Sequence, residues 1–135
     1  MPDYLDVFVA PIRDSNVAKV LVIAVMALTV ADVVFGVLNA LIHKEFESSK
    51  MREGIAHKST TAGAIFVGCI IDATIGAGVD LGYSAPVLNS VCCYIILMEV
   101  ASLIETFGKL NPQFKGSPLY QLLAVSHVVE GERNA

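Results

Sequence analysis

Residues 20–42 read VLVIAVMALTVADVVFGVLNALI, an apolar run of 23 residues with a single charge at Asp32. A helix of this length reaches about 35 Å, enough to cross the roughly 30 Å of hydrocarbon in a bilayer. Fourteen of the residues are Leu, Ile, Val or Phe. Together they favour membrane insertion by roughly 4–8 kcal/mol, against a cost of about 3 kcal/mol for the aspartate. The run therefore predicts a membrane-spanning helix.

Two further apolar runs follow. Residues 59–79 read STTAGAIFVGCIIDATIGAGV and contain Asp72, and residues 85–107 read APVLNSVCCYIILMEVASLIETF and contain Glu99, with Glu105 near the end. The charged stretch HKEFESSKMREGIAHK separates the first two runs, and the short turn DLGYS separates the last two. We expect an all-α integral membrane protein in a single membrane domain over residues 1–135. Its spans lie at about 17–42, 59–79 and 85–107, and its cytoplasmic tail at 108–135.

The composition agrees with a bilayer environment and excludes several classes. The chain is 55% hydrophobic and 16% charged, with a mean hydropathy of +0.66, which is too apolar for an ordinary soluble domain. A net charge of −4 provides no basic field for a nucleic-acid partner. There is no phosphate-binding loop or nucleophile elbow, so we expect no enzyme and no cofactor. The three histidines and three cysteines lack the spacing of a zinc site, so no metal is expected.

The segments outside the spans carry weaker signals. Leu5, Phe8 and Ile12 fall on one helical face, and Pro11 limits the helix to a short piece. This pattern predicts a short amphipathic segment lying on the membrane surface. The acidic N-terminus does not resemble a removable leader. The tail has a weak apolar pattern at residues 119, 122 and 123, and we expect its polar end, EGERNA, to be disordered.

The distribution of Lys and Arg predicts the orientation, because these residues favour the cytoplasmic side of a membrane. Seven of them lie in the first loop and the tail: Lys44, Lys50, Arg52, Lys58, Lys109, Lys115 and Arg133. The other side has only Arg13 and Lys19. We therefore expect the N-terminus outside and the C-terminus in the cytoplasm.

Each span contains one internal acid, and such acids normally face protein or water because lipid solvates them poorly. Asp72 lies in a stripe of small residues at four-residue spacing, and Asp32 lies one turn before Gly36. Small-residue faces allow helices to approach closely. We expect the pore or oligomer interface to contain Asp32, Gly36, Gly68, Asp72, Gly76, Glu99 and Glu105. The acids either line a wet pathway and respond to protonation, or serve as hydrogen-bonded contacts between helices.

Four segments resemble the toxin-secretion and phage-lysis holin family. They are DVVFG at 32–36, SSKMREGIAHK at 48–58, IID at 70–72 and YIILMEVASLIE at 94–105, of which the last is the most specific. The sequence departs from the family pattern at Thr106 and in the spacing of Pro112 and Pro118. The resemblance covers roughly residues 20–125. It implies a protein of the bacterial cytoplasmic membrane that forms homo-oligomers and opens lesions, through which an endolysin or toxin escapes.

From the residues alone, other functions remain open. A small ion- or proton-coupled transporter would use the same acids to bind and release a cation. A non-conducting membrane scaffold is the third alternative. Lysis on expression without a ligand would favour the holin, saturable uptake the transporter, and neither phenotype the scaffold.

Overall fold

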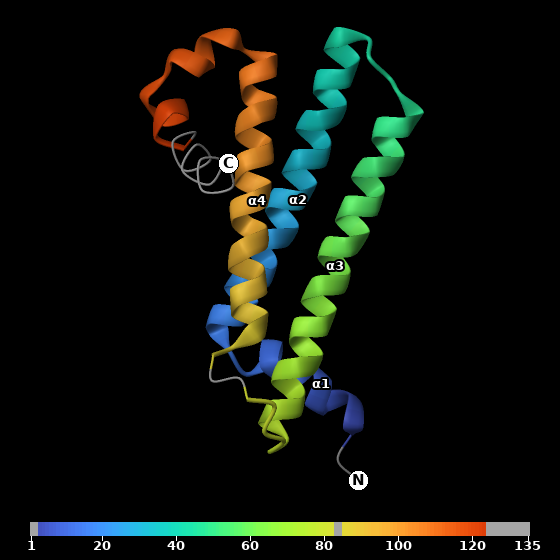
Figure 1. Cartoon of the computed structure of the whole chain (residues 1–135), viewed down its shortest axis with the longest axis vertical. Helices are drawn as coiled ribbons and strands as arrows, with labels where there is room; N and C mark the ends of the chain where they lie inside the picture. The colour runs from blue at the N-terminus through green and yellow to red at the C-terminus, as the bar shows by residue number, and fades with distance from the viewer. Residues whose placement is uncertain (1–2, 83–84, 124–135) are drawn as a thin grey trace. The chain divides into compact units, whose positions relative to one another are not determined.

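The computed structural model describes residues 3–82 and 85–123, and every regular element in these ranges is helical. The elements are α1 (Tyr4–Arg13), α2 (Asn16–His43), α3 (Ser48–Gly76), α4 (Val87–Leu110) and the 3-10 helix η1 (Pro112–Gly116) (Figure 1). By length and composition, α2, α3 and α4 are each able to cross a membrane. The expected all-α fold with three spanning helices is confirmed.

The ends of the spanning helices follow ordinary capping rules. The Ser15 hydroxyl accepts a hydrogen bond from the Ala18 N–H at 3.1 Å, and it caps the start of α2. The end of α3 is a Schellman motif: the Val79 N–H donates to the Thr74 carbonyl at 3.3 Å, and Gly78 has φ +94°. This backbone conformation suits glycine, so α3 stops there.

Helix α3 begins at Ser48, before the membrane span that is predicted to start at about residue 59. The additional residues are the charged stretch that we expected to be a connection. Lys, Met, Arg and Glu are good helix formers, so charge excludes this stretch from hydrocarbon without excluding it from a helix. Only residues 44–47 then connect α2 to α3. Helix α1 matches the short amphipathic piece that was predicted, with Pro11 near its end.

The chain forms two compact units, which we describe separately. The first contains residues up to 27 and residues 47–96. It comprises α1, α3 and the first parts of α2 and α4, around the buried residues Ala18, Val25, Leu88, Cys92 and Ile95. Ile12 of α1 and Ile65 and Cys69 of α3 pack against this core.

The second unit contains residues 28–46 and the chain from residue 97 onward. Its buried side chains are Glu99, Leu103 and Ile104 of α4. A series of edge-to-face aromatic contacts joins its elements: Phe35 contacts Phe107, Phe107 contacts Phe114, and Phe114 contacts Tyr120, with ring centroids 4.8, 6.0 and 5.8 Å apart. The polar end of the chain, for which disorder was predicted, lies outside the described residues.

Candidate functional site

Asp72 of α3 caps the first turn of α4. One carboxylate oxygen accepts a hydrogen bond from the Val87 N–H at 2.8 Å, and the other accepts one from the Leu88 N–H at 2.9 Å. The first amide groups of a helix have no partner within it, and the helix dipole favours a negative charge at this end. A cap normally comes from the residue just before the helix. Here it comes from the preceding helix, 15 residues earlier.

The glycine one turn before Asp72 allows this contact. A Cβ atom on Gly68 would lie 3.2 Å from the Leu88 Cα and 3.5 Å from the Leu88 backbone nitrogen. The first distance is tighter than ordinary van der Waals contact, and the atom concerned is backbone. Gly68 is itself buried. The absence of a side chain at this position therefore brings the carboxylate of Asp72 within reach of the α4 amide groups.

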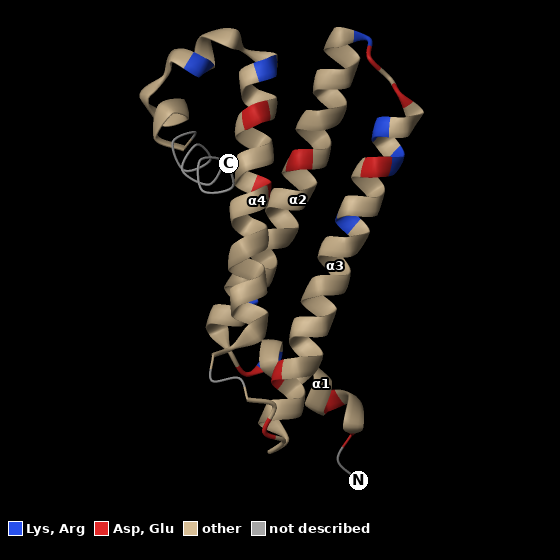
Figure 2. Cartoon of the chain, viewed as in Figure 1, with Lys and Arg blue, Asp and Glu red and all other residues tan. Residues whose placement is uncertain are grey.

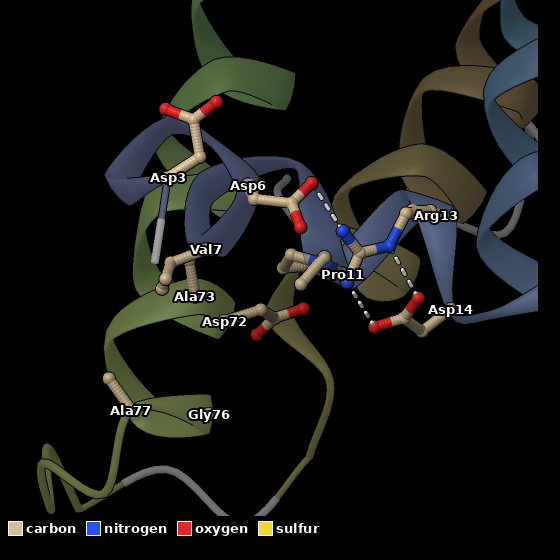
Figure 3. A pocket seen from close by; sticks show the side chains of 11 residues that line it. Asp3, Asp6, Val7, Pro11, Arg13, Asp14, Asp72, Ala73, Gly76 and Ala77 are labelled. Atoms are coloured by element: carbon tan, nitrogen blue, oxygen red, sulfur yellow. Dashed lines mark hydrogen bonds and ion pairs between the residues drawn. The ribbon is translucent and has the colours of Figure 1, made fainter. Parts of the chain in front are cut away.

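Two hollows in the first unit meet at Asp72. The larger, of about 570 Å³, lies between α1 and the last turns of α3. Figure 3 shows the Asp72 side chain beside Pro11, with Asp6 and Arg13 above it and Asp14 to its right. The second, of about 350 Å³, is lined by Asp72, Pro11 and residues at the start of α4, among them Pro86 and Asn89. Asp72 is half-buried, and the hollows leave room for water beside it.

Arg13 is held by the acids of the N-terminal segment. Its guanidinium pairs with the Asp14 carboxylate at 2.7 Å and with Asp6 (Figure 3). The hydrogen bonds to Asp14 and Asp6 raise the pKa of Arg13 further above its ordinary value. The hydrogen bond from Arg13 lowers the pKa of Asp14. All three side chains line the larger hollow and are well exposed, so these ion pairs contribute little to the stability of the fold.

The other two intramembrane acids lie in the second unit, each opposite a hydroxyl group. The Thr29 hydroxyl of α2 donates to the Glu99 carboxylate at 3.4 Å, and Glu99 is only 3% exposed. The Ser102 hydroxyl of α4 donates to the Asp32 carboxylate at 2.6 Å. Each helix thus supplies one acid and one hydroxyl, three residues apart and therefore on one face. The two reciprocal pairs connect α2 to α4.

The remaining predicted residues lie apart from these contacts. A Cβ atom on Gly36 or Gly76 would meet nothing within 4 Å, so both have open space around them, and Gly76 also lines the larger hollow. Glu105 pairs with Lys109 one turn later at 2.7 Å. The structure therefore brings Gly68 with Asp72, and Asp32 with Glu99, into two separate groups. Whether any of these residues contacts a second copy of the chain stays a prediction.

Sequence reasoning missed the partners of the acids. Thr29 and Ser102 each lie three residues from an acid in a span, and this spacing was a usable signal for a shared polar face. The cap on α4 had no comparable signal, because its acceptor and its donors lie on different helices. In the part of the chain that the structure describes, no group of three or more His, Cys, Asp or Glu side chains could hold a metal ion.

A model described as the bacteriophage holin family matches residues 15–125. No curated protein and no solved structure matches the chain. The matched range contains α2, α3 and α4 in full, with all three intramembrane acids, and it leaves α1 outside.

Proposed function

This chain belongs to the bacteriophage holin family, and we propose that copies of it assemble in the bacterial cytoplasmic membrane and open lesions that release a cell-wall hydrolase or toxin. The family resemblance found in four sequence segments is confirmed, and the chain is a multi-pass membrane protein of the holin type. The observation that carries the proposal is the coincidence of the family match with three helices long and apolar enough to span.

Assembly of many copies is part of the proposal. Three helices enclose too little space for a folded enzyme to pass, so a lesion needs several chains. Much of the lipid-accessible surface is apolar: Val30, Val33, Val34, Val37 and Leu38 of α2 are all well exposed. Gly36 borders this face, one turn after Val33, and has open space for a close approach. We propose this α2 face as the main contact between copies. Gly68 and Asp72 support assembly indirectly, through α4 of their own chain.

The hydrogen-bonded acids agree with a protein that must leave the membrane intact until lesions form. An acid in a span is costly unless it has a partner, and Asp32, Asp72 and Glu99 each accept hydrogen bonds from a neighbouring helix. We propose that these contacts hold the harmless form, and that lesion formation exposes the acids to water. The polar groups would then line the lesion and tolerate its hydration.

Inducible expression in a bacterium, with and without a co-expressed cell-wall hydrolase, tests the function. We expect sudden loss of membrane potential and viability, followed by lysis only when the hydrolase is present. Hydrolase without this chain is the control and should leave cells intact. Saturable uptake of an ion or solute without sudden killing would indicate the transporter instead. Neither phenotype, at normal membrane abundance, would indicate a scaffold.

A further inference from the structure

The segment that follows α4 has defined local structure. Its 3-10 helix η1 is capped by Asn111, whose side-chain oxygen accepts a hydrogen bond from the Gln113 N–H at 3.1 Å. Residues 118–123 are helical, and the Ser117 hydroxyl accepts a hydrogen bond from the Tyr120 N–H at 3.2 Å. We call residues 112–123 the post-α4 segment. Two side-chain caps in this short stretch set it apart from an unstructured tail.

This post-α4 segment folds back on the last turn of α4. A Cβ atom on Gly108 would lie 3.1 Å from Cε of Lys115 and 3.3 Å from the ring of Tyr120. Phe114 fills the space between, with its ring against both Phe107 and Tyr120. In Figure 1 the segment turns away from the end of α4 and returns toward the level of its last turns. Gly108 therefore serves as the docking position for the segment.

The position of α4 in the bilayer sets the level of the segment. The helix has 24 residues, which corresponds to about 36 Å, slightly more than the hydrocarbon thickness of about 30 Å. Its last turn therefore lies at the boundary between acyl chains and headgroups. Because the Tyr120 ring packs beside Gly108 in that turn, we expect residues 118–123 at the same boundary.

The two faces of the segment differ in what they contact. Tyr120 faces α4, whereas Leu119 and Leu122, three residues apart on one helical face, are 54% and 74% exposed. The stem of Lys115 lies across Gly108, and among the described residues its ammonium group makes no ion pair. Two exposed leucines and a cation at this depth match the chemistry of a lipid interface, with apolar groups toward the acyl chains and Lys toward phosphate.

We propose that the post-α4 segment is a membrane-interface anchor, in which Leu119 and Leu122 enter the acyl boundary and Lys115 contacts lipid phosphate. The anchor gives α4 a fixed depth and rotation at this end. The proposal needs only that α4 spans the bilayer, and it does not depend on lesion formation. It replaces the simple cytoplasmic tail of the sequence prediction with a segment that lies in the membrane surface.

The absence of Trp from the chain makes single-Trp reporters straightforward. Leu122→Trp and Leu119→Trp are reconstituted separately in phosphatidylcholine vesicles with brominated acyl chains, at low protein density. The neighbouring Gln121→Trp is the matched control. We expect blue-shifted emission and about twofold or greater quenching at 122 and 119 relative to 121. Similar quenching at all three positions would overturn the proposal.

A second variant tests the docking and separates lipid from protein contact. Gly108→Leu, added to the Leu122→Trp chain, should displace Tyr120 and reduce quenching. Gly63→Leu, at a glycine with nothing within 4 Å, should leave quenching unchanged. Anionic phosphatidylglycerol in the vesicles should increase the blue shift, and Lys115→Gln should remove that increase. If a second copy covered the leucines instead, position 122 would resist quenching and crosslink to its counterpart, and the proposal would fail.

Discussion

Asp72 shows how an acidic side chain is accommodated in a membrane-spanning helix. Its side chain is used fully, with one oxygen for each of two adjacent backbone amides, and a typical hydrogen bond contributes about 0.5–1.5 kcal/mol. Both oxygens lie at the positive end of the α4 dipole. A neutral side chain of the same shape reproduces only part of this arrangement, because an amide has one accepting oxygen.

Asp72→Asn should therefore leave one of the two α4 amides without a partner. We expect a loss of about 1–2 kcal/mol in stability in detergent, and faster hydrogen exchange at Val87 and Leu88 than in the parent chain. Asp80→Asn is a matched control, because Asp80 caps only the turn at Gly82, outside the spans. If the backbone amides at the start of α4 exchanged as slowly in Asp72→Asn as in Asp80→Asn, the Asp72 cap would have no energetic role.

Gly68→Leu tests the close approach that brings Asp72 to α4. The new side chain would press on the backbone of Leu88, whose Cα lies 3.2 Å from the Cβ position, so the helices must separate. We expect a destabilisation of about 1–3 kcal/mol and accelerated exchange at the α4 start. The same substitution at Gly63, which has open space, should cost less than half as much. Thermal unfolding in detergent compares the two, and an equal loss would refute the packing role of Gly68.

At the level of single residues, the sequence identified the acids but not their partners. A charged residue inside an apolar run can be recognised from the sequence alone, as for Asp32, Asp72 and Glu99. A cap that one helix supplies to another depends on the approach of two helices, which depends in turn on Gly68 and the packing around Leu88. That packing is a property of the folded chain, and spacing alone does not encode it.

Among the elements, α2 and α4 share the reciprocal acid–hydroxyl arrangement. The interaction energy of one of these pairs can be measured by a double-mutant cycle on Asp32→Asn and Ser102→Ala. These two side chains contact one another directly at 2.6 Å. Hydrogen bonds between helices in membranes average about 0.6 kcal/mol and reach about 1.7 kcal/mol. We expect a coupling in this range, and the short distance favours its upper part.

Unfolding in mixed micelles would give the coupling energy of that cycle. Asp32→Asn with Ser90→Ala is the control pair, since the Ser90 hydroxyl donates to the carbonyl of Pro86, the residue just before its own helix. This pair should show no coupling within error. A coupling near zero for Asp32 with Ser102 would mean that the contact contributes nothing to holding α2 against α4.

The extents of the spanning helices were predictable only in part. Hydropathy located the apolar core of α2, α3 and α4, since burial in lipid depends on composition over about 20 residues. It did not find the start of α3, because the backbone hydrogen bonds of a helix continue through charged residues in water as readily as through apolar ones in lipid. The helical turns at 112–116 and 118–123 were also missed, since they pack through aromatic contacts such as Phe114 with Phe107, which the spacing of residues does not predict.

For the molecule as a whole, the placement of basic residues is the main guide to orientation. Figure 2 shows Lys and Arg at the N-terminal end of α3 and, separately, at and after the end of α4. Since only residues 44–47 join α2 to α3, the first loop is confined to one side of the membrane. The sequence prediction of an outer N-terminus stays a prediction, and it has a direct test.

We expect Ser48→Cys, in a chain without its native cysteines, to be protected from an impermeant thiol reagent in intact cells. Asp80→Cys should be labelled under the same conditions. Both positions are exposed in the structure, so protection reports the membrane side and not burial in protein. Permeabilised cells provide the control, in which both positions must react. The reverse pattern in intact cells would place the N-terminus in the cytoplasm.

The cap that Asp72 provides also has a consequence for biogenesis. Of the three spans, α3 is the least apolar, and an unpartnered aspartate near its end adds a cost of up to about 3 kcal/mol. Among the described residues, its carboxylate accepts hydrogen bonds from the Val87 and Leu88 amides, which are synthesised after α3. The two helices are thus expected to leave the translocation channel as a hairpin, after α4 has been synthesised. A nascent chain ending at residue 82 should insert α3 poorly in a glycosylation-mapping assay, and Asp72→Leu should restore insertion without α4. Efficient insertion of the unmodified truncated chain would show that α3 enters the bilayer alone.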